Sequence, residues 1–301
     1  MGKFQRVQIR APKQLCIYDG IYSISFIQFT AELASRTILK GERVKVDLSE
    51  VSRITAAACV MLFAETTRAQ LVTGDPGIID FKLPDDSNIR RTFIHSGLWG
   101  AVRPGSVGKL ESLWRSKSPF ASGTEPRKHL ESTLETLSVL SPVTLPPRFD
   151  SAISEAMLNV YHHAYEGVSS SGAESGIGRR WWQYMNVRPH KASFIICDLG
   201  QGIPRTCRLS GWNHFHDGEL IKGAMREGFS TRMSKGGRGM GCLDLQRPVA
   251  SSTVEQLAIF SNQGIYWFKE GGNIELDHRD ASLPGTILEW SIRLPEGHDE
   301  N

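Results

Sequence analysis

The chain has 301 residues, of which 40% are hydrophobic and 22% charged, and its formal net charge is +3. This length accommodates two domains, and the composition is typical of globular proteins with hydrophobic cores. The small net charge argues against a nucleic-acid-binding surface. The five scattered cysteines argue against a disulfide framework or a zinc site. Because neither a signal peptide nor a membrane-spanning apolar window is visible, we expect a soluble, cytoplasmic protein.

The first hundred residues alternate strand-like and helix-like patterns. Residues 43–48 alternate apolar and polar side chains, as a strand does. Residues 56–70 and 86–98 have helical spacing, and Gly97 can end the second of these helices. Strand and helix in alternation predict an α/β domain over residues 1–100.

Gly, Pro and Ser punctuate the next segment, which predicts a linker at residues 101–124 with a short helical piece at most. A second domain is expected over residues 125–297, as an α+β sandwich with helices packed on one face of a mixed sheet. Its expected elements are an amphipathic helix at 130–140, a helix from about 150, a strand at 192–198, a long polar segment to about 234, a helix after 241, and strands at 253–260, 264–269 and 286–294.

A polar stripe marks the second helix of this domain. Glu155, Asn159 and His163 are spaced by four residues and therefore share one helix face. An amide oxygen can ligate Mg²⁺ held by phosphates, while a carboxylate can orient or deprotonate a nucleophile. The alternative is an ordinary exposed face of an amphipathic helix.

An apolar strand ends at Asp198, and Gly200 and Gly202 follow at alternate positions. A buried carboxylate at a strand end can accept the exocyclic amine of adenine, and glycines let the backbone pass close to the ring. The alternative is a common strand followed by a glycine turn.

A third patch alternates Gly237, Gly239 and Gly241 before an expected helix start. Backbone N–H groups there can cradle phosphate oxygens at the positive end of the helix. Lys235 and Arg238 are close enough in sequence to meet the same phosphates, although solvated surface charges are the alternative. The patch is neither a Walker loop nor a Rossmann motif, since no Gly-Lys-Ser/Thr follows and no strand leads directly into it.

The fourth patch is a terminal strand opened by Gly285 and Thr286, whose hydroxyl can reach the base or its bound water. The sequence also contains the potential metal ligands His214, His216 and Asp217, but they suggest no fourth ligand. We therefore do not expect a transition-metal site there.

Together and in this order, the four patches resemble the N box, the two glycine boxes and the closing Gly-Thr strand of the GHKL ATPase superfamily. The helix around Glu155 is most similar to that of the bacterial anti-sigma-factor serine kinases. The resemblance implies ATP and Mg²⁺ as cofactors, Glu155 as catalytic base and Asn159 as metal ligand. It assigns the nucleotide to Asp198, Gly200, Gly202, Lys235, Gly237, Arg238, Gly239, Gly241, Thr286 and His163.

The same resemblance makes residues 204–236 an ATP lid that orders over the nucleotide. Residues 166–190 form an additional loop that is longer than in the anti-sigma-factor kinases. Trp181 and Trp182 in this loop either form an exposed contact surface or pack against the domain.

Residues 44–57 and 91–98 resemble a STAS domain, the fold of the anti-anti-sigma proteins that these kinases phosphorylate. STAS substrates carry an Asp-Ser-Ser or Asp-Ser-Thr run where this chain has Thr55, Ala56 and Ala57. Alanine at the phosphoacceptor position excludes phosphorylation there. We therefore expect a STAS-like module that binds a partner or regulates the chain itself.

The sequence predicts an ATP- and Mg²⁺-binding regulatory protein that acts as a serine/threonine-protein-kinase-like or ATP-hydrolysing signalling protein on a protein partner. That partner is expected to be a regulatory or substrate protein, STAS- or sigma-related. The alternatives are an ATP-gated binding switch or a scaffold with little or no catalysis, although an intact Glu155 argues against the scaffold. A homodimer is left open, while nucleic acid and membrane are not expected.

Overall fold

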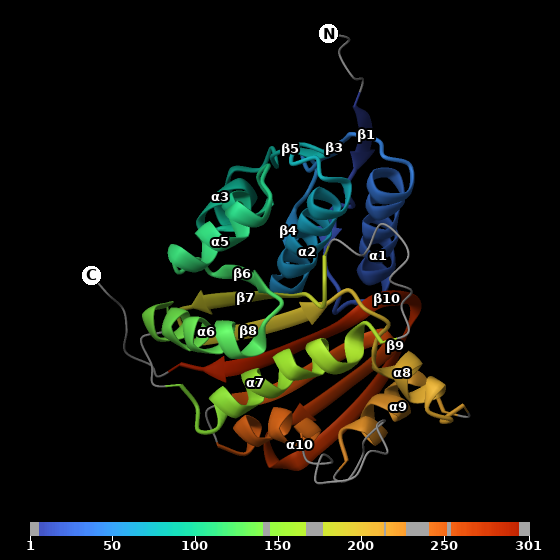
Figure 1. Ribbon diagram of the computed structural model, residues 1–301, viewed down its shortest axis with the longest axis vertical. Helices are drawn as coiled ribbons and strands as arrows, with labels where there is room; N and C mark the ends of the chain where they lie inside the picture. Colours follow the sequence, from blue (N-terminus) through green and yellow to red (C-terminus); the bar gives the residue numbers. More distant parts are fainter. Residues whose placement is uncertain are drawn as a thin grey trace. The chain divides into compact units, whose positions relative to one another are not determined.

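The computed structural model describes residues 6–140, 145–166, 177–213, 215–226, 241–251 and 254–294 (Figure 1). These residues form two compact units, which are described separately below. The first unit contains residues 6–122 and 177–178, and the second contains the rest.

The first unit contains a three-stranded parallel sheet of order β1-β3-β5. Its strands are β1 (Val7–Arg10), β3 (Val44–Asp47) and β5 (Ile79–Lys82). The strands β2 (Gln14–Leu15) and β4 (Arg53–Ile54) form a second, parallel pair. Parallel strands need helical crossovers, so this topology agrees with the expected α/β pattern.

The helices of the first unit are α1 (Gly20–Ala34), which continues as the π-helical η1 (Ser35–Leu39), α2 (Ala56–Thr73), α3 (Ser87–His95), α4 (Leu98–Val102) and α5 (Val107–Arg115). The expected helix at 86–98 divides at Gly97, which has a φ of 84°. Its start is capped by the Asp86 carboxylate, which accepts hydrogen bonds from the backbone amides of Asn88 and Ile89.

The linker expected at residues 101–124 contains more regular structure than the sequence indicated. Helix α5 occupies nine of its residues, and strand β6 (Phe120–Gly123) follows. Leu110 and Leu113 are buried and give α5 an apolar side. Pro104, Gly105 and Ser106 lie between α4 and α5, and Ser116, Ser118 and Pro119 lie between α5 and β6, so these residues separate short elements.

The second unit contains strands β7 (Trp181–Arg188), β8 (Lys191–Asp198), β10 (Asn273–Arg293) and β9 (Val254–Lys269), which are neighbours in this order. These three pairings are antiparallel. The strands expected at 253–260 and 264–269 are one continuous strand, β9.

Strand β7 corrects the prediction of a loop over residues 166–190 for residues 181–188, while residues 167–176 lie outside the described residues. Trp181 and Trp182 in β7 are both fully buried, so the alternative of an exposed contact surface is wrong. The tryptophans instead contribute their large apolar area to the interior.

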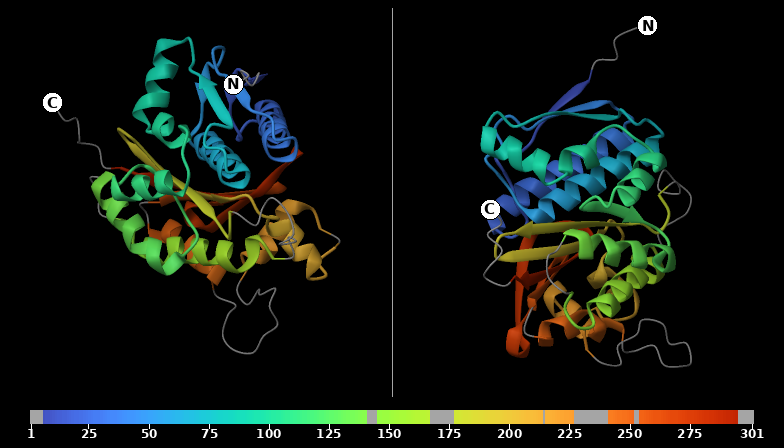
Figure 2. Two further views of the ribbon diagram at one scale, coloured as in Figure 1. Left: turned by 45° about the horizontal axis from the view of Figure 1, so that its top comes forward. Right: turned by 90° about the vertical axis from the view of Figure 1, so that its left-hand side faces the viewer.

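The helices of the second unit lie on one side of its sheet, as the left view of Figure 2 shows. They are α6 (Pro126–Leu140), α7 (Phe149–Asn159), the π-helical η2 (Val160–Ala164), α8 (Ile203–Leu209), α9 (Asp217–Ala224) and α10 (Gly241–Gln246), with the short 3₁₀ segments η4 (Arg247–Ser251) and η5 (Glu270–Gly272).

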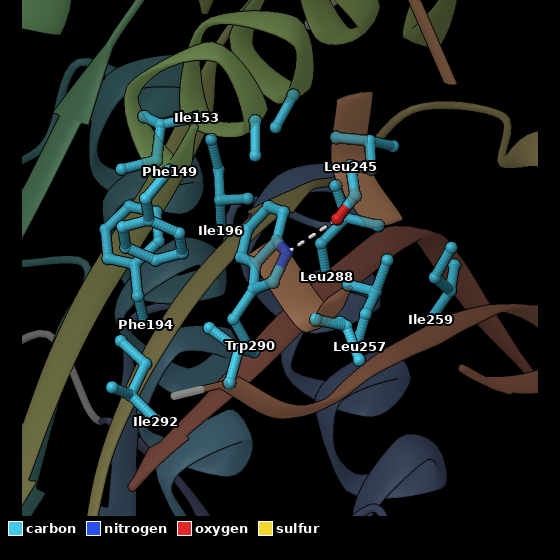
Figure 3. Packing of buried hydrophobic residues seen from close by; sticks show 14 of the residues in the cluster. Phe149, Ile153, Phe194, Ile196, Leu245, Leu257, Ile259, Leu288, Trp290 and Ile292 are labelled. Atoms are coloured by element: carbon cyan, nitrogen blue, oxygen red, sulfur yellow. Dashed lines mark hydrogen bonds between the residues drawn. The ribbon is translucent and has the colours of Figure 1, made fainter. Parts of the chain in front are cut away.

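An aromatic cluster joins α7 to this face of the sheet (Figure 3). The rings of Phe149 and Trp290 meet edge to face with their centroids 5.7 Å apart, and Phe194 stacks on Trp290 at 6.0 Å. The indole N–H of Trp290 donates to the carbonyl oxygen of Leu245 at 2.9 Å. This hydrogen bond ties α10 to the same core and so fixes α10 beside α7.

Candidate functional site

Helix α7 separates an apolar face from a polar one. Ile153 and Met157 are fully buried against the sheet, whereas Glu155 and Asn159 are partly exposed. The Glu155 and Asn159 side chains, one helical turn apart, hydrogen-bond to each other. The structure therefore brings together two of the three residues in the predicted polar stripe.

The third residue of the stripe, His163, lies in the π-helical turn η2, which follows Asn159 directly. A π turn holds more residues than an α turn, so His163 does not continue the α-helical spacing of Glu155 and Asn159. The Nδ1 atom of His163 lies 3.6 Å from a carboxylate oxygen of Glu166. The continuous stripe predicted by α-helical spacing is thus interrupted at its third member.

Glu155 lies in an environment that favours its neutral form. Burial, and after it the negative charge of Asp244, raise the pKa of Glu155 to about 7, although the hydrogen bond from Asn159 lowers it. Asp244 belongs to α10, which packs against α7, and it pairs with Arg247 at 2.5 Å. Sequence reasoning missed Asp244, because an isolated aspartate in a short helix carries no motif.

Asp198 ends strand β8 and is 5% exposed. Its carboxylate accepts hydrogen bonds from the backbone amides of Gly200, at 2.8 Å, and Thr286. Burial outweighs these two bonds and raises the pKa of Asp198 to about 7. Because Thr286 is the residue directly opposite Asp198 in the ladder between β8 and β10, the second and fourth sequence patches are neighbours.

The glycines around Asp198 are required by the packing of the protein itself. A Cβ atom on Gly200 would overlap the carbonyl oxygen of Ala164, and one on Gly285 would overlap that of Asp198. Gly202 has a φ of +82°, and a Cβ atom there would lie 2.8 Å from the Ser261 hydroxyl oxygen. The glycine spacing that suggested a ligand therefore has a sufficient explanation in close backbone contacts.

Ser261 organises this end of the site, and no sequence pattern indicated it. It is fully buried in β9, and its Oγ accepts a hydrogen bond from the backbone amide of Ile203 at 2.9 Å. The same hydroxyl lies 3.0 Å from the carbonyl oxygen of Gly285 and 2.9 Å from the hydroxyl of Thr286. The Thr286 hydroxyl, expected to face a base, is thus engaged with Ser261. The signal that could have indicated Ser261 is a single serine directly after the apolar residues 257–260 of the strand.

The end of α7 is fastened to the turn after Asp198. The backbone amide of Gln201 donates to the carbonyl oxygen of Ala164 at 2.8 Å. The Tyr165 hydroxyl donates to the carbonyl oxygen of Arg180 at 2.7 Å and accepts from the backbone amide of Leu199. The helix with Glu155 and the turn after Asp198 are therefore neighbours, as the sequence predicted.

The third patch is only partly visible. Gly241 is the first residue of α10, which packs against α7, so the start of this helix adjoins the helix that carries Glu155. Lys235, Gly237, Arg238 and Gly239 lie outside the described residues.

The described part of the expected lid, residues 204–236, is folded rather than irregular. Helices α8 and α9 pack through Cys207, Leu220 and Ala224. Asp217 is buried, pairs with Arg208 at 2.5 Å, and accepts from the backbone amide of Gln263 in β9 at 2.8 Å. The contact with Gln263 anchors α9 to the sheet.

The described residues lack three other kinds of feature. They contain no group of three or more His, Cys, Asp or Glu side chains placed to hold a metal, and His214 lies outside them. None of the five cysteines forms a disulfide. Within the same residues, no helix combines the length and apolarity that a bilayer span needs.

Neither a comparison with models of protein families nor a comparison with curated proteins finds a match for this chain.

Proposed function

We propose that the second unit binds ATP with Mg²⁺ in the manner of the GHKL ATPases and acts on a protein partner by phosphoryl transfer or ATP hydrolysis. One observation carries the proposal. The helix with the hydrogen-bonded Glu155 and Asn159 pair is fastened, through Ala164 and Gln201, to the turn that begins at the buried Asp198. A nucleotide bound in the manner of the GHKL ATPases would place its base at the Asp198 end and its phosphates at the Glu155 end.

The donor set at α7 fits Mg²⁺. This ion prefers oxygen ligands, keeps several waters, and is usually held by one or two protein oxygens together with substrate phosphates. The Asn159 amide oxygen supplies one such ligand on a partly exposed helix face. When bound, Mg²⁺ neutralises phosphate charge, which is the main requirement of phosphoryl transfer.

Glu155 is the base in this proposal. A carboxylate whose pKa is raised to about 7 holds a proton more strongly than an ordinary glutamate, and it is still substantially deprotonated near neutral pH. It can therefore accept the proton of a Ser or Thr hydroxyl or of water. Asp198 would accept the exocyclic amine of adenine, while the amides of Gly200 and Thr286 hold its carboxylate in place.

The substrate hydroxyl belongs to another protein in this proposal. Thr55, the hydroxyl residue beside the alanine at the STAS-like phosphoacceptor position, is 9% exposed and donates to the carbonyl oxygen of Leu15 at 3.2 Å. Phosphorylation would break this bond and place a charged group in the interior. The first unit therefore serves as a binding or regulatory module.

An assay with radiolabelled ATP separates the reactions. The full chain is incubated with [γ-³²P]ATP and Mg²⁺, with and without candidate STAS- or sigma-related partners, and Glu155→Ala is the control. Label on a partner supports a kinase, and release of free phosphate alone supports an ATPase or slow switch. If the chain binds the nucleotide but forms neither product, it is a scaffold, and the proposed catalysis is contradicted. Glu155→Ala is expected to bind ATP but to produce neither product.

A further inference from the structure

Three large apolar side chains are exposed around the turn between α8 and α9, which lie side by side in the second unit (Figure 1). Leu209, Trp212 and Phe215 are 70%, 39% and 53% exposed. They are three of the twelve large hydrophobic side chains that are exposed among the described residues, and they lie within seven consecutive positions. Single exposed apolar side chains are normal, whereas a group of them marks a contact surface. We call these three side chains the apolar corner.

Contacts within the second unit hold the apolar corner in place. Trp212 lies so close to α9 that a Cβ atom on Gly223 would be 2.7 Å from its ring. The rings of Trp212 and Phe215 have their centroids 6.2 Å apart. Arg208 donates to the carbonyl oxygen of Phe215 at 3.3 Å and pairs with the buried Asp217. The two rings are therefore exposed but already positioned, which lowers the entropy cost of binding a partner.

Two arginines beside the apolar corner give it a positive charge. Arg205 precedes Leu209 by four positions on α8 and shares its helix face. Arg226 follows α9, and its backbone amide donates to the carbonyl oxygen of Gly223 at 3.2 Å. Both arginine side chains are exposed, and neither forms an ion pair with any described residue. The other charged side chains of α8 and α9 form the ion pairs Arg208–Asp217 and Lys222–Glu219. The charges of Arg205 and Arg226 are thus left unbalanced within these helices.

We propose that the apolar corner is a docking surface for an acidic amphipathic segment of a partner protein. Apolar side chains of the segment cover Leu209, Trp212 and Phe215, and its carboxylates pair with Arg205 and Arg226. Aromatic residues and arginine are the side chains that contribute most to binding at protein interfaces.

A membrane surface fits the apolar corner less well than a protein does. Anionic lipid headgroups are usually recognised by about four to eight clustered cations. Here two unbalanced arginines border the corner, and α8 has only seven residues. The inference goes beyond the proposed function, and it does not require that the chain bind a nucleotide.

Binding of a labelled peptide to the full chain, without nucleotide, tests the surface. The probe is a fluorescein-labelled amphipathic helical peptide with leucines on one face and glutamates on the other, followed by fluorescence anisotropy. A matched peptide carries lysines in place of the glutamates. We expect saturable binding of the glutamate peptide to the wild type and binding at least about 10-fold weaker for the lysine peptide, because opposite charges select the partner.

Three variants locate the binding site. Leu209→Ser combined with Phe215→Ser is expected to weaken binding of the glutamate peptide by about 10-fold or more. Arg205→Gln combined with Arg226→Gln should weaken it by about 5-fold and reduce its dependence on salt. Val139→Ser is the control, because Val139 is 62% exposed but lies on α6, and binding should not change. All substituted side chains are exposed, so the thermal unfolding midpoints should stay equal.

Several results would contradict the inference. If the glutamate peptide does not bind the wild type, or binds no more tightly than the lysine peptide, the corner is not a surface for an acidic segment. If the Leu209 and Phe215 substitutions leave binding unchanged, or Val139→Ser weakens it equally, the peptide binds elsewhere. Cosedimentation with phosphatidylserine vesicles that these two substitutions abolish would assign the corner to a membrane instead. None of these results depends on ATP, so they are distinct from a failure of the proposed function.

Discussion

The two ends of the proposed nucleotide site are built differently. Around Asp198, buried hydrogen bonds and close backbone contacts account for nearly every residue that the sequence singled out, including Gly200 and Gly285. On α7, Glu155 and Asn159 form a partly exposed polar pair on the side of the helix away from its core, so packing does not account for them. Glycine spacing is therefore weak evidence for a ligand in this protein. The polar pair is stronger evidence, because burial does not require it.

The largest expected effect tests the claim that packing fixes the Asp198 end. Gly285→Ala is expected to destabilise the protein by about 3 kcal/mol or more, since the new Cβ would overlap the Asp198 carbonyl at a φ of +68°. The control is Gly74→Ala, with a φ of +65° and no atom within 4 Å of its Cβ, which should cost only about 1–2 kcal/mol. Equal losses in urea unfolding would show that overlap is unimportant.

The Asp198 carboxyl should make stability depend on pH. Its pKa in the folded chain, about 7, is above the ordinary value of 3.8 for an aspartate, so the folded state holds the proton more tightly. Stability is therefore fully supported below about pH 4 and falls as the pH rises toward 7. Asp198→Asn should remove this slope and gain a few kcal/mol at pH 8 but nothing at pH 4. Parallel wild-type and variant curves from urea unfolding between pH 4 and pH 8 would contradict the burial argument.

A smaller effect is expected at Ser261. Ser261→Ala leaves the backbone amide of Ile203 without its acceptor in the interior, which should cost about 1–3 kcal/mol. Ser138→Ala is the control, because the exposed Ser138 hydroxyl donates to the Leu134 carbonyl oxygen of its own helix. That change should stay within about 0.5 kcal/mol. If the two variants had similar thermal unfolding midpoints, the hydrogen bonds of Ser261 would not be important for stability.

The smallest expected effect concerns Glu155 on α7 and the pH dependence of turnover. A base works deprotonated, so turnover by Glu155 should rise with pH through about 7. Asp244→Asn removes a negative neighbour and should move this limb to lower pH. The exposed Asp150 in the first turn of α7 gives a control variant, Asp150→Asn, with the limb unmoved. If Asp244→Asn left the pH–rate profile unchanged, the charge of Asp244 would not affect the pKa of Glu155.

Elements with a strong local pattern could be predicted from the sequence. The periodic apolar residues of α2 and the apolar run of β8 each indicated the right element. Strand β7 was missed, because its run Trp-Trp-Gln-Tyr-Met does not alternate and follows a Gly- and Ser-rich stretch. Helices α8 and α9 were hidden in a polar segment, and their stability comes from tertiary contacts such as that of Asp217 with Gln263.

The candidate site was predictable only where spacing along the chain determines geometry. Residues four apart on a helix must meet, so the Glu155 and Asn159 pair followed from the sequence. The π turn that contains His163 has no reliable local signal in the sequence. Ser261 and Asp244 enter the site through the pairing of β9 with β10 and the packing of α10 on α7, which no single segment encodes.

Calorimetric titration of ATP, in the presence of Mg²⁺, into the wild type and Asn159→Ala tests the central claim most directly. The account predicts binding of one ATP per chain to the wild type and the loss of Mg²⁺-ATP binding in Asn159→Ala. Asp198→Asn should weaken binding by about 10- to 100-fold, as the loss of a charged hydrogen-bond acceptor does. Unchanged ATP affinity in Asn159→Ala, or no binding to the wild type, would contradict the account.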